Sequence, residues 1–347
     1  MKVSILTFHD GINYGAFFQV YALRRFLQTH GYESEVINYK SPGFTFREYK
    51  CFLNFLMLSP VTVVRNLIKI FKFKKAHRKL GFTKRFFSRK TLAREVFDRV
   101  VIGSDEVWNC NSSLIGYDPV YFSEGINAKK IVSYAATCGS VKSADTVPVE
   151  LQNALKRVDR VSVRDENSVS VMLQIGIEDA VKVLDPTFLV ELSKRAIIPE
   201  ERDFILIYGF FSDEMIRHIK EYIRFIGKKT IAVSYPCKWC DKSLETLDPF
   251  EWLGYFAICD RVITTMYHGA LFSIQNSKEF CMYGTPYRKN KIGGLFNELG
   301  IKGRFVDDSV SLKDVFSRPL DYEFIKTRVE ARVNESGEFL LASLGEQ

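Results

Sequence analysis

The feature of this 347-residue chain that most constrains its fold is a short apolar segment that runs into a polar turn and then into a helix pattern. At 262–265 the residues are all β-branched, the turn at 266–269 contains His268, and apolar helix residues follow. In a parallel α/β protein, ligands lie outside the carboxyl ends of the strands. This segment therefore predicts an α/β fold with His268 at a ligand-binding edge, where its ring can exchange a proton near neutral pH. The alternative is a histidine that caps a helix or fills the core.

Two further segments have the same pattern. The strand predicted at 2–8 is followed by a turn with Asn13 and Tyr14, which could bind a hydroxyl-rich ligand or simply serve the turn. A second strand ends in Gly103-Ser104-Asp105, with Trp108 just beyond it. Asp105 could bind sugar hydroxyls while Trp108 stacks on the ring, or Asp105 could cap the next helix. The glycines after the first strand do not form GxGxxG, so a dinucleotide cofactor is not expected.

The whole chain alternates strand and helix patterns, which predicts two Rossmann-like domains with parallel sheets. The first, at 1–190, holds a mostly helical insertion at 45–95; the second, at 200–347, carries His268. Strands are predicted at 2–8, 34–39, 98–102, 130–134, 160–163, 180–184, 203–208, 229–234, 260–264 and 279–283, with helices at 16–30, 148–157, 165–175, 212–226, 248–257 and 269–276.

The net charge of +8 comes from one segment. Residues 61–94 hold 12 of the 49 Lys and Arg and no Asp or Glu, which leaves 37 basic against 41 acidic residues elsewhere. Apolar residues alternate with these charges and give helical stripes with a cationic face. The segment is either a solvated helical hairpin or a surface for anionic lipid headgroups. Nucleic-acid binding is less favoured, because no nucleic-acid module accompanies the patch.

Seven scattered cysteines are typical of a reducing compartment. Cys237 and Cys240 form a single CxxC without a second pair or nearby histidines, which predicts a loop with two thiols and no zinc site. No apolar run reaches about 20 residues, and no secretory signal is recognised at the amino terminus. The sequence therefore predicts a cytoplasmic protein.

Taken together, the polar strand ends resemble those of the polysaccharide pyruvyl transferase family. The motifs, in chain order, are Thr7-Phe8-His9, Asn13-Tyr14-Gly15-Ala16 with Gln19 and Tyr21-Ala22-Leu23, Gly103-Ser104-Asp105 with Val107-Trp108, Ser133-Tyr134-Ala135-Ala136, Ser162-Val163-Arg164-Asp165-Glu166, Leu184-Asp185-Pro186-Thr187, and Tyr267-His268-Gly269 with Phe272-Ser273. The resemblance implies a fold like that of GT-B glycosyltransferases. It also implies transfer of a pyruvyl group from phosphoenolpyruvate to a sugar of a surface-polysaccharide precursor as a ketal, without a metal or other cofactor. A lipid-linked oligosaccharide acceptor would bring the enzyme to the inner face of the membrane.

The resemblance also assigns roles. His268 matches the family's histidine and is the expected acid/base. Arg164 matches a family arginine and is expected to bind the carboxylate or phosphate of the donor, unless it pairs with Asp165 or Glu166. Asp105 is expected to orient or deprotonate the acceptor hydroxyl. The loops around Asn13, Asp105, Arg164 and His268 are expected to share one cleft.

One position departs from the family pattern. Two residues before the histidine the family has an arginine that holds the donor, whereas this chain has Met266. The expected substitutes are Arg288, Lys289 and Lys291, in a loop that precedes a helix beginning near 293–294. If no cation substitutes, two other functions remain: a nucleotide-sugar glycosyltransferase, or a non-catalytic member of a glycan-assembly complex.

Overall fold

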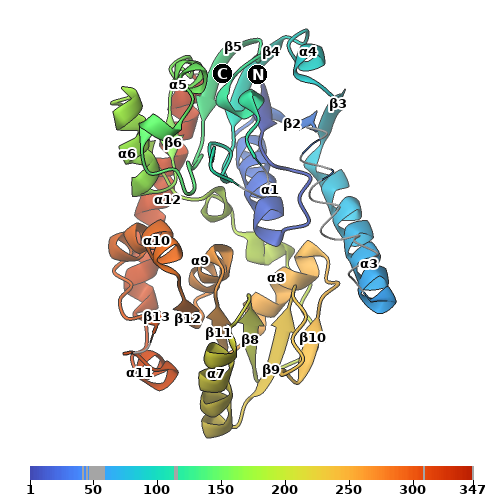
Figure 1. The fold of residues 1–347 in the computed structure, drawn as a ribbon, viewed down its shortest axis with the longest axis vertical. Helices are drawn as coiled ribbons and strands as arrows, with labels where there is room; N and C mark the ends of the chain where they lie inside the picture. The colour runs from blue at the N-terminus through green and yellow to red at the C-terminus, as the bar shows by residue number, and fades with distance from the viewer. Residues whose placement is uncertain (41–42, 44–45, 47–58, 113–115, 308, 346–347) are drawn as a thin grey trace. The chain divides into compact units, whose positions relative to one another are not determined.

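The computed structural model describes residues 1–40, 43, 46, 59–112, 116–307 and 309–345. It divides into two compact units, drawn in Figure 1. The first unit comprises Met1–Leu67, Lys74–Val190 and Glu330–Gln347, and the second comprises Ile68–Phe73 and Glu191–Val329. Each unit is built on a parallel sheet, so the predicted α/β fold with two parallel sheets is confirmed.

The sheet of the first unit has the order β3-β2-β1-β4-β5, and every pairing is parallel. This is the order of a doubly wound fold, in which the connections reverse direction between β1 and β4. A separate two-stranded sheet, β6-β7, follows in the chain. The strands are β1 Lys2–Leu6, β2 Glu33–Tyr39, β3 Phe82–Phe86, β4 Phe97–Ile102, β5 Ala128–Ser133, β6 Ser162–Val163 and β7 Val181–Lys182.

Two of the helices in the first unit show how side chains cap a helix start. Asn13 caps α1 by accepting from the Ala16 amide, and Asp165 caps α6 by accepting from the Ser168 amide. The helices are α1 Tyr14–Thr29, α3 Pro60–His77, α4 Arg89–Leu92, α5 Val149–Leu155 and α6 Glu166–Ile175, with 3₁₀ turns η1 Arg78–Leu80, η2 Pro119–Phe122, η3 Ala144–Thr146 and η4 Pro186–Phe188. Within the described part of the chain, no helix is long and apolar enough to cross a membrane.

The predicted helical insertion at 45–95 is corrected in its last third. Residues 47–58 lie outside the described residues, and α3 follows as predicted, but Phe82–Phe86 forms the edge strand β3. Phe82 pairs with Val36 and Phe86 with Tyr39 on β2. The sequence of this strand predicts a helix stripe because its basic residues obscure the alternation of apolar and polar residues that is typical of a strand. Residues 82–86 form a strand because the backbone of β2 supplies hydrogen-bond partners along its edge.

The sheet of the second unit has the order β10-β9-β8-β11-β12-β13 and is again parallel, with the reversal between β8 and β11. The short edge strands β10 and β13 carry too few residues to show a strand pattern in the sequence. The elements are η5 Leu192–Arg195, β8 Phe204–Tyr208, α7 Asp213–Ile226, β9 Lys229–Val233, β10 Lys242–Leu244, α8 Pro249–Ile258, β11 Arg261–Thr264, α9 Tyr267–Gln275, β12 Glu279–Tyr283, α10 Pro286–Glu298, β13 Phe305–Val306, α11 Leu312–Phe316 and α12 Tyr322–Leu344.

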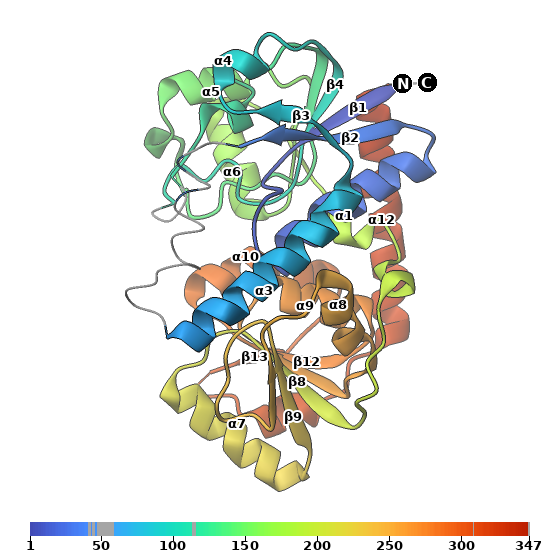
Figure 2. The same cartoon turned by 90° about the vertical axis from the view of Figure 1, so that its right-hand side faces the viewer.

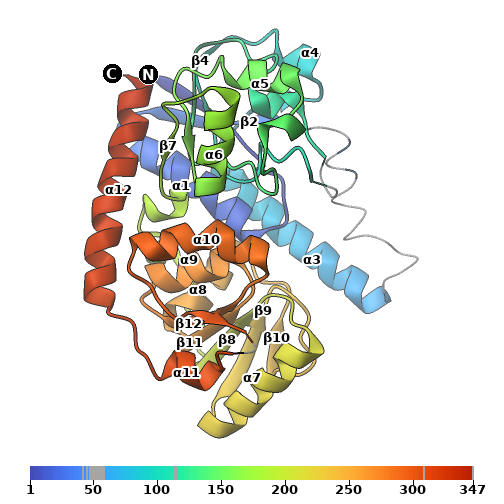
Figure 3. The same ribbon diagram turned by 60° about the vertical axis from the view of Figure 1, so that its left-hand side comes forward.

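Helices cover both faces of this second sheet, as Figures 2 and 3 show. On one face, Ile207 and Ile263 pack in a core with Ile219 of α7 and Val315 of α11. On the other face, rings from α8 and α9 meet edge-on, such as Trp252 and Phe272 with centroids 5.1 Å apart. Because both faces are covered, all five residues of β8 are buried. Its sequence is therefore continuously apolar and does not alternate with polar residues.

The carboxyl-terminal helix does not belong to one unit. The sequence predicted that 200–347 would form the second domain, but Glu330–Gln347 lies with the first unit. There, the Ser336 hydroxyl accepts a hydrogen bond of 3.0 Å from the buried Leu184 amide, and the Arg99 guanidinium donates to the Leu344 carbonyl at 2.6 Å. The boundary was missed because a continuous helix pattern contains no break at the point where its packing partners change.

We predict that Ser336→Ala destabilises the protein by about 1–3 kcal/mol, because the Leu184 amide would remain buried without an acceptor. Thr327→Ala on the exposed part of the same helix is the matched control and should change stability by less than about 0.5 kcal/mol. Urea denaturation measures both variants. Equal stabilities would show that the Ser336 contact does not anchor the helix.

Candidate functional site

The turn that carries His268 lies where the strand order of the second unit reverses. The Thr264 hydroxyl, at the end of β11, donates to the Tyr208 carbonyl at the end of β8 over 2.6 Å. The Met266 amide donates to the same Thr264 hydroxyl at 2.9 Å, which fixes the first turn of α9. His268 is the second residue of α9 and is half-buried. The side chain therefore lies at the helix N-terminus, where backbone N–H groups and the helix dipole favour anions.

Close packing of α9 against the strands depends on Gly269. A Cβ atom at this position would lie 2.2 Å from the Thr264 hydroxyl and 3.0 Å from a ring carbon of Tyr208. Two residues of the Tyr-His-Gly motif thus differ in what they contribute. Glycine allows the helix to start directly on the two strand ends, and His268 is then presented beside them.

Aromatic and basic side chains surround this helix start. The Tyr267 ring meets the His268 ring edge-on, with centroids 5.2 Å apart. The Lys291 ammonium lies over the same Tyr267 ring, 5.2 Å from its centroid. A cation is therefore close to the N-terminus of α9, although position 266 itself is methionine.

The three predicted substitute cations are in a helix and not in a loop. Thr285 caps α10 by accepting from the Arg288 amide, and Pro286 takes the first helical position. The pair Thr285-Pro286 is a sequence signal for a helix start. The predicted start near the glycines at 293–294 is therefore too far along the chain. Because these residues lie on a helix, their side chains have different partners. Lys289 pairs with Asp307 at 3.0 Å, whereas the charge of Arg288 acts on Tyr235 and opposes the rise in its pKa that burial causes.

The sequence analysis missed a fourth cation, Lys69 of α3. Its ammonium is buried within the second unit and donates to the Ser234 carbonyl at 2.9 Å, just after β9. It also lies 5.7 Å from the centroid of the Tyr235 ring. Burial lowers the pKa of Lys69 to about 8, against the opposing attraction of Glu245. Helical spacing could have indicated this burial, since Lys69 falls on the same helix face as the buried Phe73 and Ala76. The twelve basic residues of the segment made one buried lysine hard to recognise.

In the first unit, the polar strand ends are also joined at the reversal point. The Thr7 hydroxyl, after β1, donates to the Ser104 carbonyl, after β4, at 2.7 Å. The Gln19 amide of α1 donates to that Thr7 hydroxyl at 3.3 Å. Three of the motif segments thus meet through hydrogen bonds of their side chains, and Gln19 serves this junction.

Arg164 forms an internal ion pair that the sequence did not predict. Its Nη1 donates to Asp185 at 2.7 Å and to the Ser104 hydroxyl at 3.2 Å, and both charged side chains are almost fully buried. Asp185 also accepts from the amide and hydroxyl of Thr187. A buried guanidinium held in this way joins β6, η4 and the turn after β4. Its environment differs from that expected of an arginine presented to a soluble donor.

The two acidic neighbours considered as partners for Arg164 have other roles. Asp165 accepts from the Ser168 amide and the Thr137 hydroxyl, and Glu166 pairs with Lys182. Both results agree with helix geometry, since residues one and two positions apart do not face each other on a helix. The true partner, Asp185, lies 21 residues further on and is brought close by the pairing of β6 with β7.

Asp105 lies in an unusual backbone conformation. Its φ is +87°, a region that costs energy for any residue with a Cβ atom. Its carboxylate accepts from the Glu106 amide at 2.9 Å, and its carbonyl accepts from the Thr137 amide at 3.0 Å. The side chain is half-buried. The surroundings hold the strained turn in place and fix the direction of the carboxylate.

Two of the predicted ligand-binding residues are core residues. Trp108 and Tyr14 are each 1% exposed, and the Trp108 indole donates to the Tyr121 carbonyl at 2.9 Å. Stacking of Trp108 on a sugar is therefore corrected, because neither face of its ring is accessible. An apolar residue after a strand end cannot be assigned to core or ligand from sequence alone. Asn13 is exposed and caps α1.

Two buried histidines lie next to the first turn. Burial lowers the pKa of His9 and lowers that of His77 to about 4. Asp10 forms an ion pair with Lys40 at 2.5 Å beside them. Both imidazoles are therefore neutral at physiological pH, and neither supplies a cation for a donor anion.

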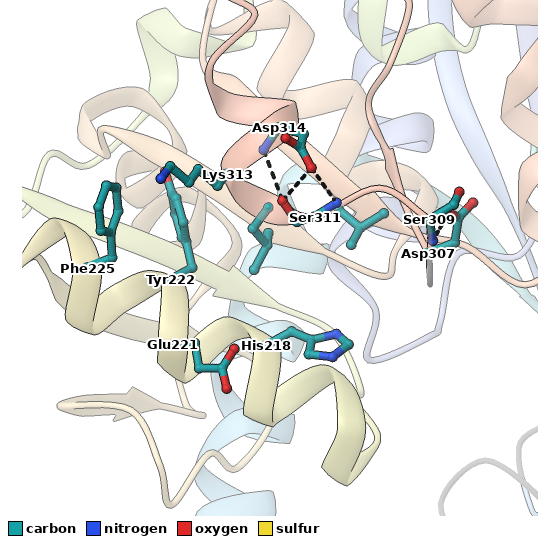
Figure 4. Close-up of a pocket in the computed structure, with 11 residues that line it drawn as sticks. His218, Glu221, Tyr222, Phe225, Asp307, Ser309, Ser311, Lys313 and Asp314 are labelled. Atoms are coloured by element: carbon teal, nitrogen blue, oxygen red, sulfur yellow. Dashed lines mark hydrogen bonds between the residues drawn. The ribbon is translucent and has the colours of Figure 1, made fainter.

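A hollow of about 520 Å³ lies between α7 and α11 of the second unit (Figure 4). None of the predicted site residues lines it. Both aspartates that line it are engaged in local structure: Asp314 forms a capping box with Ser311 on α11, and Asp307 accepts from Ser309 and Lys289. These hydrogen bonds lower the pKa of Asp307 to about 2. Size alone does not make this hollow the reactive site.

The CxxC segment forms a loop between β9 and β10. The Cys237 and Cys240 sulfurs lie 2.6 Å apart, and their mutual hydrogen bond is the main cause that lowers the pKa of Cys237. Among the described residues, no group of three or more His, Cys, Asp or Glu is placed to hold a metal ion.

Solved structures with the same architecture confirm a GT-B-like fold. Trehalose-6-phosphate synthase OtsA is 9% identical, with a TM-score of 0.54 over 100% of this chain and 99% of its own. A UDP-GlcNAc 2-epimerase from Methanocaldococcus jannaschii, solved with UDP-GlcNAc and UDP, is 13% identical, with a TM-score of 0.50 over 98% of each chain. No curated protein sequence matches the chain.

The family assignment comes from the motifs themselves. The profile described as polysaccharide pyruvyl transferase matches residues 13–286, which include every strand end described above except the first. The chain belongs to the polysaccharide pyruvyl transferase family and is a transferase. Membership implies a pyruvyl donor and a polysaccharide acceptor in general terms.

We predict that Gly269→Ala destabilises the protein by about 1–3 kcal/mol, because the new methyl group would overlap the Thr264 hydroxyl. Gly293→Ala in α10 is the matched control, since a Cβ there meets no atom within 4 Å and should add up to about 1 kcal/mol of stability. Chemical denaturation measures both. A Gly269→Ala variant as stable as wild type would refute the close packing.

A second prediction concerns Lys69. Below pH 8 this lysine is charged in both folded and unfolded chains, so folding bears the full cost of burying the charge. Between about pH 8 and 10.5 the folded state releases its proton first, and stability rises. We therefore expect wild type to gain about 2 kcal/mol relative to Lys69→Met between about pH 7 and pH 9.5.

Urea denaturation at the two pH values measures this difference. Lys220→Met, at an exposed lysine of α7, is the control and should show no such trend. Parallel stability profiles for wild type and Lys69→Met would mean that Lys69 titrates at an ordinary pKa in the folded protein.

Proposed function

We propose that this enzyme transfers the pyruvyl group of phosphoenolpyruvate to a sugar of a surface-polysaccharide precursor and forms a pyruvate ketal. The observation that carries the proposal is the basic edge of the second unit. Lys291 lies over Tyr267 at the helix N-terminus that presents His268, Lys69 lies near the Tyr235 ring, and the charge of Arg288 acts on Tyr235. Such an arrangement suits a small ligand with a carboxylate and a phosphate.

Arg288 and Lys291 take the place of the arginine that the family has two residues before the histidine. Lys291 lies over the Tyr267 ring, directly beside His268, and Arg288 acts on Tyr235 from the first turn of α10. Lys289 is held by Asp307 and contributes less. A donor anion would then be held by side chains of α10 and by the backbone N–H groups of α9.

The chemistry requires proton transfers, and the family resemblance supports assigning them to His268. Protonation of C3 of the enol makes C2 electrophilic, and a sugar hydroxyl adds to C2 as it loses its proton to a base. A second hydroxyl then displaces phosphate from C2 and closes the ketal. His268 delivers the proton to C3, and Asp105 accepts or orients the hydroxyl proton. Arg164 positions the Ser104–Asp105 turn through its bonds to Ser104 and Asp185.

The acceptor is a lipid-linked oligosaccharide, and the enzyme works in the cytoplasm as a peripheral protein at the inner membrane face. The family supports a polysaccharide acceptor, and the basic segment 61–94 supports contact with anionic headgroups. Asn13, on the exposed start of α1, is available to bind an acceptor hydroxyl.

The direct test is thermal stabilisation of the purified chain by phosphoenolpyruvate, with UDP and GDP in parallel. A ligand at 100 times its dissociation constant adds about 2.7 kcal/mol, which is readily measured. We expect phosphoenolpyruvate to stabilise wild type and His268→Gln alike, and the double variant Arg288→Ala/Lys291→Ala to lose the effect. Lys302→Ala, at an exposed lysine, is the charge-matched control.

Transfer itself is followed by incorporation of labelled pyruvyl groups into the glycan-lipid fraction. His268→Gln should lower it by about 10²–10⁴-fold while donor binding remains. Stabilisation by a nucleoside diphosphate alone would overturn the proposal in favour of a nucleotide-sugar transferase. No stabilisation by any of the three ligands, together with full biological function of His268→Gln, would indicate a non-catalytic role.

A further inference from the structure

Helix α3 has a second apolar surface that is exposed. Five of its residues are between 44% and 68% exposed, although all are large and apolar. They repeat at intervals of three and four residues and form one stripe along the helix, which we call the α3 stripe: Val61, Val64, Leu67, Ile68 and Phe71.

The α3 stripe is not the face that holds the helix in the protein. Val63, Ile70, Phe73 and Ala76 supply that face, and all four are buried. At about 100° per residue, the stripe spans an arc of about 120° away from these buried residues. A surface helix of a globular protein ordinarily has a single apolar face. The second one therefore needs a partner beyond the fold.

The charges around the α3 stripe indicate what that partner is. On the helical wheel, Lys74 borders one side of the stripe, and Arg65 and Lys72 border the other. Lys75 falls within the arc near the carboxyl end of the helix, where its long stem can lie along apolar surface while its ammonium reaches water. No Asp or Glu occurs from 61 to 94. The stripe thus combines apolar side chains with a mainly basic border, in which Lys72 also forms an ion pair with Glu251 at 2.8 Å.

We propose that the α3 stripe inserts into the surface of an anionic membrane. Phe71 and Val64 would enter the boundary between headgroups and acyl chains, and the basic residues of the border other than Lys72 would contact lipid phosphates, as amphipathic interfacial helices do. This specifies the residues for the membrane contact proposed above. It rests on that part of the proposed function and not on the identity of the donor.

Two other partners fit the stripe less well. A second copy of the chain would bring two basic borders together, which like-charge repulsion opposes. A nucleic acid would use the positive charge but leave Val61, Val64 and Phe71 without an apolar environment. An anionic lipid surface satisfies both the apolar stripe and its charged border.

The test is flotation of the full chain with vesicles of phosphatidylglycerol and phosphatidylcholine in roughly equal amounts, compared with phosphatidylcholine alone. Wild type should bind the anionic vesicles, and Val64→Ser/Phe71→Ser should bind them at least about tenfold more weakly because it loses inserted apolar area. Val149→Ser/Leu173→Ser is the matched control, since these residues of the first unit are similarly exposed, and it should bind as wild type does.

Other outcomes would overturn the proposal. Equal binding by Val64→Ser/Phe71→Ser, verified as folded by its thermal transition, would remove the stripe from the contact. Equal binding of wild type to neutral vesicles would remove the role of charge. Dimerisation of wild type in sedimentation that Val64→Ser/Phe71→Ser abolishes would assign the stripe to a second copy. Stabilisation by phosphoenolpyruvate without vesicle binding would refute the membrane contact alone and leave the donor assignment intact.

Discussion

Parallel pairing of strands is the constraint on which the rest of this protein depends. It places all carboxyl ends of a sheet at one edge, and each of the two sheets reverses its order next to its first strand. At each reversal a threonine hydroxyl donates to the carbonyl of the neighbouring turn: Thr7 to Ser104, and Thr264 to Tyr208. The motif residues of the family therefore serve these junctions in part: Thr7 and Ser104 form the first, and Gly269 packs against the second. Only some of them remain available for chemistry.

This division explains why motif membership is a poor guide to individual roles. Trp108 and Tyr14 belong to the motifs but lie in the core. Arg164 is held by Asp185, and breaking such a buried pair by removing one partner is far more costly than its net contribution to stability suggests. By contrast, His268 stands at a helix start that is half-buried, and Asp105 keeps a strained backbone. Those are the two motif residues whose surroundings favour a chemical role.

The strands, helices and their alternation could be predicted because each long element has a local pattern of buried residues. The errors have specific causes. Strand β3 lies at a sheet edge, and its basic residues mask the strand period. Helix α10 begins at Pro286, before the glycines at 293–294 where its start was predicted. His268 follows a strand as predicted, whereas the buried Lys69 was not singled out, because a buried lysine is recognised only when its carbonyl partner on Ser234 is seen.

The sequence by itself determined the fold class, the family and the position of His268 after a strand, since these follow from apolar spacing and motif order along the chain. Tertiary structure alone decided which partner each cation has. Lys291 reaches Tyr267 from α10, Lys69 reaches Tyr235 from α3, and Lys289 turns to Asp307. The physical reason is that electrostatic partners are chosen by distance in space, and residues far apart in sequence become neighbours only when the sheet has formed.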